Sequence, residues 1–212
     1  MGTSSKLRKY RSDHEELNTR SRSAIIEAGH VLFLNQGIAS TTMGEIADQA
    51  GVSRVTVYRH FPECGAIAFE VYSRMLESIL EATRAQVPPG VSGLEAARHC
   101  LDALFSAYPA QETAFRFCAA FSSYYATEER SDELAEWYDN REFQGLADAC
   151  AQFFGTQFDQ ETSNRLMALT DAATSGLCSL AVTGSPLNGT DVEARLHNLK
   201  ELILGHFDAV VA

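Results

Sequence analysis

Residues 52–61, VSRVTVYRHF, place several kinds of hydrogen-bond donor within about three helical turns. Arginine can bond bidentately to guanine O6 and N7, and threonine or valine methyl groups can contact the methyl group of thymine. Tyr58 and His60 can donate to phosphate oxygens, which fixes the register of a protein on DNA without reading its sequence. These side-chain types therefore predict chemistry directed at a DNA duplex.

Two features before this segment are also suited to phosphate contacts. Thr41 and Thr42 precede a predicted helix, where hydroxyl groups and free backbone N–H groups attract anions. The cationic stretch KLRKYR at 6–11 would lie along the DNA backbone or reach into the minor groove, with a solvated tail as the alternative. The predicted DNA-contacting residues are Thr41, Thr42, Ser53, Arg54, Val55, Thr56, Tyr58, Arg59 and His60.

The elements that must position these side chains are two short helices joined by a tight turn. Thr42 and Glu45 have the types and spacing of a capping box at the start of the first helix. Gly51 is suited to end that helix, and Ser53 to cap the next one, which is expected to stop near Phe61. This is the layout of a helix-turn-helix, whose second helix enters the major groove.

The second helix is predicted to have one buried side. Val57 and Phe61 are four residues apart and would share the face that packs on the rest of the domain. Arg54, Val55, Tyr58 and Arg59 would then face outward.

Composition limits the classes of protein that remain. The 212 residues are 45% hydrophobic, which is enough for a core in one large or two small domains. No apolar run approaches the roughly 18 residues that span a bilayer, and the N-terminus lacks a secretory signal. We therefore expect a cytoplasmic protein with no membrane partner.

The charge is unevenly distributed along the chain. The formal net charge is −11, yet residues 1–62 carry eight Lys or Arg and six Asp or Glu, so they hold +2 and residues 63–212 hold −13. The N-terminal part is suited to face a polyanion, and the acidic remainder would repel one.

The stretch TTMGEIADQAGVSRVTVYRHFP resembles the DNA-binding segment of the tetracycline-repressor (TetR) family of bacterial transcriptional regulators. The similarity runs from AIIEAGHVLFLNQGIASTTM to FPECGAIAFEVY and covers about 50 residues. It implies an all-α homodimer of nine helices per chain. In that arrangement the first three helices bind DNA, the fourth links them to a ligand-binding core, and the last two form a four-helix dimer interface. The residues that carry the resemblance are Thr42, Ile46, Ala47, Gly51, Val52, Ser53, Tyr58 and Phe61.

Three regions follow from these patterns: a flexible basic arm at 1–18, a helix-turn-helix domain at 19–62, and a ligand-binding and dimerisation domain at 63–212. Glycine, proline and apolar periodicity predict helices at 19–36, 42–50, 53–61, 63–86, 92–107, 110–126, 131–157, 160–182 and 190–210.

The last two predicted helices carry regular apolar seams with steps of three and four residues, which are suited to helix–helix packing. The resemblance places the dimer interface there. The predicted interface residues are Leu166, Leu169, Ala173, Leu177 and Leu180, with Leu196, Leu199, Ile203 and Phe207.

Aromatic and flexible apolar residues cluster in the predicted ligand-binding core. As a set they are suited to an apolar or aromatic effector, whereas each of them alone is also typical of ordinary core packing. The candidates are Phe105, Tyr108, Phe117, Phe121, Tyr124, Trp137, Phe143 and Met167. Arg116 and Arg141 could pair with an anionic ligand or with acidic neighbours.

One departure from the family pattern falls at Cys64, where the family usually has a Lys that contacts phosphate. Loss of that contact should lower the salt slope of DNA binding by about one unit, and Glu63 beside it could repel DNA. A cysteine near a helix N-terminus can also have a lowered pKa and sense oxidants, or it can simply be a tolerated small residue.

No metal-ligand spacing, nucleophile motif or glycine-rich phosphate loop is present, so the sequence predicts no enzyme, no cofactor and no metal site. The sequence favours a ligand-responsive repressor that binds a near-palindromic duplex operator as a homodimer and is released by a small apolar or aromatic effector. The alternative is a small-molecule sensor or carrier of the same fold that has lost DNA binding and acts through a protein partner.

Overall fold

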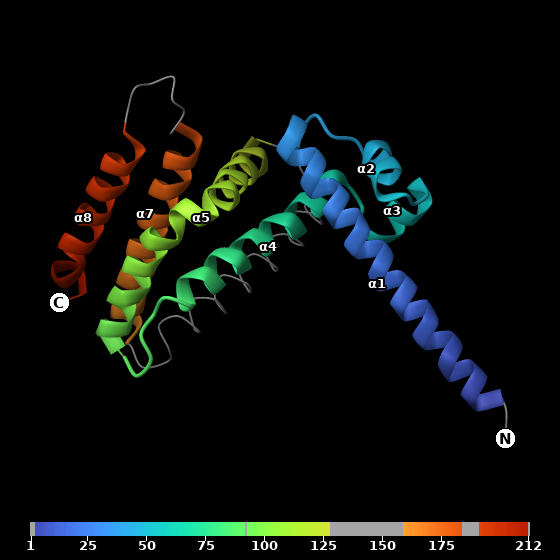
Figure 1. Cartoon of the computed structure of the whole chain (residues 1–212), viewed down its shortest axis with the longest axis horizontal. Coiled ribbons are helices and arrows are strands. Elements are labelled where there is room, and N and C mark those ends of the chain that lie inside the picture. The colour runs from blue at the N-terminus through green and yellow to red at the C-terminus, as the bar shows by residue number, and fades with distance from the viewer. Residues whose placement is uncertain (1–2, 92, 128–158, 184–190, 212) are drawn as a thin grey trace. The chain divides into compact units, whose positions relative to one another are not determined.

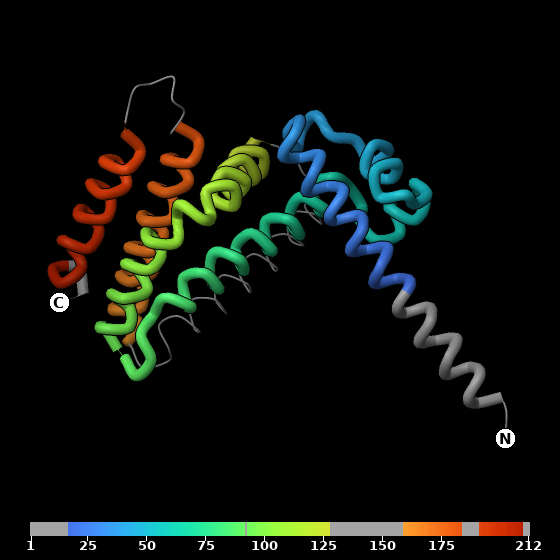
Figure 2. Tube along the Cα trace, viewed as in Figure 1, coloured from blue at the N-terminus to red at the C-terminus, as the bar shows by residue number. Residues whose placement is uncertain are grey.

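The computed structural model describes the backbone of residues 3–91, 93–127, 159–183 and 191–211, and the side chains of those between Leu17 and Ala209 (Figure 2). Regular structure in these residues is entirely α-helical, as predicted (Figure 1). The helices are α1 (Thr3–Gln36), α2 (Met43–Ala50), α3 (Arg54–His60), α4 (Cys64–Arg84), α5 (Gly93–Thr127), α7 (Gln160–Thr183) and α8 (Val192–Val211). The helix expected at 131–157 lies outside the described residues.

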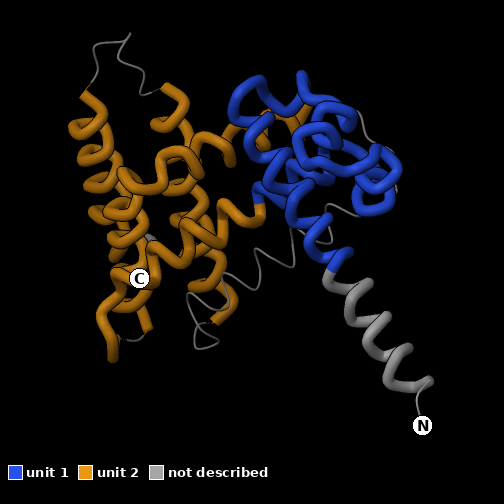
Figure 3. Tube along the Cα trace, turned by 45° about the vertical axis from the view of Figure 1, so that its right-hand side comes forward, with its two compact units in different colours: residues 1–72 blue, residues 73–212 orange. Residues whose placement is uncertain are grey.

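The chain forms two compact units, Met1–Tyr72 and Ser73–Ala212 (Figure 3). The boundary falls inside α4 rather than at residue 62, because the first turns of α4 belong to the first unit. Ala66, Ile67 and Phe69 are buried there. Arg22 of α1 also forms an ion pair with Glu70 of α4, with a distance of 2.5 Å between Nη2 and Oε1.

Helix α1 begins at Thr3, well before the predicted start at 19. Residues 3–28 contain no glycine or proline, so the sequence offers no strong signal that would end the helix earlier. The cationic stretch 6–11 is therefore part of a helix in the structure, and its contact with DNA stays a prediction. The end of α1 is as expected, because Gly37 adopts a left-handed conformation with φ of 85° directly after Gln36.

The core of the first unit is formed by the facing sides of its helices. Gly29 allows α1 and α4 to approach closely, since a Cβ atom at this position would lie 2.7 Å from Cγ2 of Ile67. The buried core residues are Ile25, Ile26, Ala28, Phe33, Ile38, Met43, Ile46, Ala47, Val57, Phe61, Ala66, Ile67, Ala68, Phe69 and Val71.

In the second unit, α5 packs against α7 and α8 (Figure 1). The sequence predicted two helices, 92–107 and 110–126, but the structure has the single helix α5 with Pro109 inside it. Proline removes one intrahelical hydrogen bond and disfavours continuation of a helix. Tyr108 and Phe115 on either side of it are buried, and this packing offsets the local cost.

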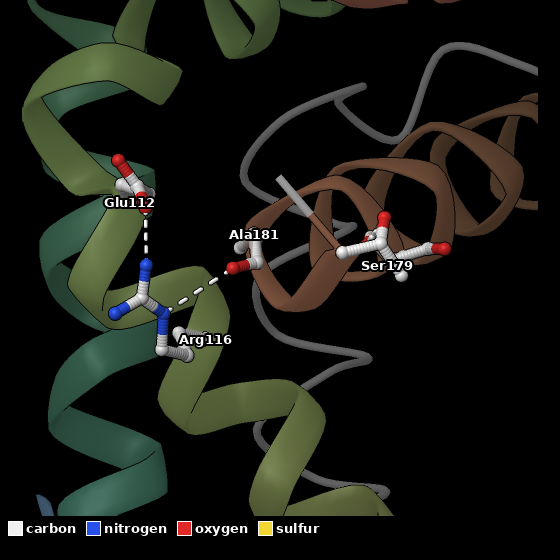
Figure 4. A network of polar contacts seen from close by, with 5 residues as sticks. Glu112, Arg116, Ser179 and Ala181 are labelled. Atoms are coloured by element: carbon white, nitrogen blue, oxygen red, sulfur yellow. Dashed lines mark hydrogen bonds and ion pairs between the residues drawn. The ribbon is translucent and has the colours of Figure 1, made fainter. Parts of the chain in front are cut away.

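A polar contact joins α5 to the end of α7 (Figure 4). Arg116 donates from Nε to the carbonyl oxygen of Ala181 at 3.2 Å, and its Nη2 forms an ion pair with Glu112 one helical turn away. Of the two roles predicted for Arg116, the structure therefore supports pairing with an acidic neighbour.

The apolar seams of α7 and α8 lie inside a single chain. Leu166, Ala173 and Leu177 are fully buried, while Leu180 is 3% and Phe207 2% exposed. A side chain with no exposed surface cannot contact a second copy unless the chain opens. The buried members of the seams therefore pack within one chain. Leu196 and Leu199 are half-buried, and contact of the seams with a second copy stays a prediction.

Helix α7 is long and apolar enough to cross a membrane by length and composition alone. Its buried seam accounts for that apolarity in a folded core, and such a helix is weak evidence for a membrane span.

We predict that Gly29→Ala destabilises the first unit. The new methyl group would meet a branched methyl of Ile67, whose side chain is rotationally stiff, so the helices must move apart at a cost of about 1–3 kcal/mol. Chemical denaturation followed by circular dichroism measures the change. In an Ile67→Ala background the same substitution should cost less, since Cε2 of Phe33 at 3.2 Å then remains the close neighbour. An equal loss in both backgrounds would contradict the contact with Ile67.

Candidate nucleic-acid interface

The start of α2 is fixed by the predicted capping box, which the structure confirms. The side-chain hydroxyl of Thr42 accepts from the backbone N–H of Glu45 at 3.2 Å, and Glu45 Oε2 accepts from the backbone N–H of Thr42 at 2.8 Å. These bonds lower the pKa of Glu45, chiefly through the backbone N–H of Thr42. At the other end, Gly51 adopts φ of 66° and ψ of 32°, the left-handed conformation that glycine adopts without strain. The turn to α3 is therefore encoded locally.

Helix α3 is capped by Ser53, again as predicted. Ser53 Oγ accepts from the backbone N–H of Thr56 at 3.1 Å, and the two hydroxyl oxygens lie 2.8 Å apart. Both hydroxyls therefore serve the cap in the structure, and their contact with DNA stays a prediction.

The buried side of α3 is the expected one. Val57 is fully buried and Phe61 is 2% exposed. The guanidinium carbon of Arg22 lies 5.1 Å from the centre of the Phe61 ring, and the same arginine pairs with Glu70. The aromatic side chain that follows α3 is thus covered by an arginine of α1 that also pairs with α4.

The opposite side of α3 faces solvent. Val55 is 79% and Tyr58 57% exposed, and Arg54 and Arg59 are also exposed. The side chains of these four residues make no hydrogen bond or ion pair with the residues that the structure describes. Two arginines and a tyrosine therefore present unused donors side by side, together with an apolar contact at Val55.

Thr41 and His60 do not belong to this outward set. Thr41 is 6% exposed and donates its hydroxyl hydrogen to the carbonyl oxygen of Gly37 at 2.8 Å. His60 Nε2 is buried and has no hydrogen-bond partner among the described residues. Burial, followed by the charges of Arg59 and Arg22, lowers the pKa of His60. The residue types predicted phosphate contacts here, but the fold turns these atoms inward. Thr42 remains exposed.

Cys64 begins α4 and is tied to the loop before α2. Its thiol donates to the carbonyl oxygen of Thr41 at 3.2 Å. Burial, with the charges of Glu63 and Glu45, raises the pKa of this thiol to about 11. The possibility of a lowered pKa is therefore contradicted, because desolvation outweighs any effect of the helix N-terminus. The structure favours a structural role for Cys64.

The predicted effector-contacting residues are partly described. Phe105, Tyr108, Phe117 and Phe121 of α5 are buried, and their role in ligand binding stays a prediction. Tyr124 is half-buried and Met167 is 40% exposed. Trp137 and Phe143 lie outside the described residues, as does Arg141.

Within the described part of the chain, no three His, Cys, Asp or Glu side chains are grouped closely enough to hold a metal ion.

Comparison with known proteins identifies this segment. Residues 25–70, from the second half of α1 into α4, match the family model for bacterial regulatory proteins of the tetR family. The chain therefore carries a segment similar to the DNA-binding segment of this family. The match includes the capping box, the Gly51 turn and the whole of α3.

Alignments that are longer than this segment have lower sequence identity. The chain is 28% identical to the HTH-type transcriptional repressor BepR of Brucella suis over 172 residues, which is 79% of each protein. It is 25% identical to the HTH-type transcriptional activator FasR of Mycolicibacterium smegmatis over 50% of the chain and 48% of the relative. The chain spans 24% to 48% of the first curated relatives it matches. A TetR-family regulator structure from Streptomyces coelicolor has the same fold, with a TM-score of 0.61, 19% identity, and 92% and 99% of the two chains covered.

His60 predicts a pH dependence of stability. Its pKa in the folded chain lies below the usual 6.5, so below that pH the unfolded chain binds more protons and folding weakens as pH falls. Unfolding measured between pH 5 and pH 8 should show this slope, and His60→Gln should flatten it. An unchanged slope in the variant would contradict burial of the imidazole.

Proposed function

We propose that this protein is a TetR-family transcriptional repressor that binds duplex DNA through α3. The observation that carries the proposal is the division of this helix into two sides. Val57 and Phe61 fix one side in the core, while Arg54, Tyr58 and Arg59 leave their donors unused in solvent. A major groove supplies both kinds of partner that these side chains lack, namely base acceptors and phosphate oxygens.

A homodimer would place two copies of α3 on a near-palindromic operator. Half-sites about 34–36 Å apart, one helical turn of the DNA, would let both copies enter the same face of the DNA.

The sign of regulation is argued from the two relatives. BepR is named as a repressor and FasR as an activator. We propose repression, because the alignment with BepR covers a larger share of this chain than the alignment with FasR.

The dimer surface we propose is the outward side of α7 and α8. Small residues on α7 recur there with steps of four, three and four, namely Ala168, Ala172, Ser175 and Ser179. On α8 the exposed residues include Asn198, Leu202, Gly205 and Ala209. Small side chains let two helix pairs approach closely, and Leu202, at 57% exposed, supplies an apolar anchor.

We infer that an effector binds in the second unit. The buried aromatic residues of α5 support an apolar or aromatic ligand, and Arg116, already bonded to Glu112 and Ala181, favours such a ligand over an anion. Helix α4 begins in the first unit and ends in the second, so a change near its end is carried by one continuous element. For induction, the effector must bind more tightly to the conformation that does not bind DNA.

The rival function is a sensor or carrier of the same fold without DNA binding. Cys64 supports it, because a lysine that usually contacts phosphate is replaced by a thiol turned toward Thr41. A protein of this kind would show effector binding and no sequence-dependent affinity for DNA.

Arg54→Ala and Tyr58→Ala should weaken binding to a duplex that the wild-type protein selects from random-sequence DNA. Loss of a bidentate arginine contact corresponds to roughly a tenfold change or more. Fluorescence anisotropy measures the affinity, with Arg74→Ala, an exposed arginine of α4, as the matched control. Both α3 positions are exposed, so thermal stability should stay near that of the wild type. Unchanged affinity in both variants would refute the assignment of α3.

Leu202→Asp should convert dimers to monomers, because a carboxylate would be desolvated at the centre of the surface on α7 and α8. Sedimentation velocity measures the distribution. Leu34→Asp replaces an exposed leucine of α1 and serves as the control. Dimers that persist in Leu202→Asp would place the interface elsewhere.

A further inference from the structure

Gly44 of α2 lies directly beneath the side chain of Arg54 of α3. A Cβ atom added at Gly44 would lie 2.7 Å from Nη2, 2.9 Å from Cζ and 3.1 Å from Nε of Arg54. Real Cβ atoms essentially never lie within 3.0 Å of such a neighbour, and a distance of 3.1 Å is already unusually short. The guanidinium group therefore occupies the space that a side chain at position 44 would need, and any other residue at this position would displace it.

The backbone gives no other reason for glycine at this position. Gly44 does not have a positive φ, unlike Gly37, Gly51, Gly90 and Gly93. It lies in the first turn of a helix of eight residues, where glycine is a poorer helix former than alanine. Close approach of Arg54 is the feature of the structure that requires the missing side chain.

The contact also explains how an exposed arginine is held in place without a polar partner. The side chain of Arg54 makes no hydrogen bond or ion pair with the described residues, so its donors stay available. Packing of the flat guanidinium on α2 restricts the directions in which these donors can point. An arginine whose planar fork is already oriented loses less freedom when it binds.

We propose that Gly44 is a positioning residue that orients Arg54 for DNA recognition. The inference rests on the proposed function of α3. It adds a role for α2, which carries no outward cation. A side chain at position 44 would leave Arg54 present and charged, yet free to sample orientations that do not match a base pair.

A double-mutant cycle tests this role. Wild type, Gly44→Ala, Arg54→Ala and the double variant are titrated by fluorescence anisotropy against the duplex selected by the wild-type protein and against a scrambled duplex. We expect Arg54→Ala to lose affinity roughly tenfold or more and Gly44→Ala about fivefold. The double variant should match Arg54→Ala, because the glycine acts only through the arginine. Affinity for the scrambled duplex should change little in Gly44→Ala, since the charge of Arg54 is retained.

Stability separates positioning from misfolding. Gly44→Ala should unfold at the same temperature as the wild type or higher, because alanine favours the helix and only the end of a flexible side chain must move. Gln49→Ala, an exposed substitution on the same helix, is the control and should leave both stability and affinity unchanged.

The outcomes distinguish this inference from the function on which it rests. Wild-type binding that Arg54→Ala weakens and Gly44→Ala does not would overturn the positioning role and leave DNA recognition by α3 intact. An equal loss from Gly44→Ala with and without Arg54 would also overturn it, since the glycine would then act independently. Absence of any sequence-dependent binding by the wild type would remove the proposed function and this inference with it.

Discussion

Burial of Phe61 at the end of α3 is the interaction on which the orientation of this helix depends. Its ring lies under the guanidinium of Arg22 from α1, and Arg22 is paired with Glu70 of α4, so one arginine links the end of α3 to two other helices. Val57 is buried on the same side, so this side of α3 faces the core and the opposite side faces solvent. The outward direction of Tyr58 and Arg59 follows from this burial, and Arg54 has in addition its contact with Gly44.

The local devices of this unit were predictable because each of them depends on a few neighbouring residues. The capping box and the cap at Ser53 need only a side chain and a backbone group three residues away, and Gly51 bonds to carbonyl oxygens three and four residues before it. The buried side of α3 was predictable from helical spacing. Residue type could not show where a donor points: the hydroxyl of Thr41 is bonded to Gly37, and Nε2 of the half-buried His60 is buried.

Tertiary packing decided the features that the sequence did not predict. Pro109 is a strong signal for a helix boundary, yet buried aromatic residues on both sides keep α5 continuous. An apolar seam shows that a helix packs against something, but not whether the partner is the same chain or another copy. Leu166 and Leu177 have the spacing of an interface and are core residues. The contact between Gly44 and Arg54 joins two helices across the turn, so no single-helix pattern could show it.

In the proposed complex, α3 of each copy lies in the major groove of one half-site. Protection of guanine N7 from methylation tests this placement most directly, since N7 is exposed in that groove. With the duplex selected by the wild-type protein, the account predicts two protected clusters about 10 base pairs apart, or a multiple of that spacing, and loss of protection within both clusters when Arg54 is replaced by alanine. Retained affinity with guanine N7 reactive throughout the site, or one protected cluster without a second, would contradict it.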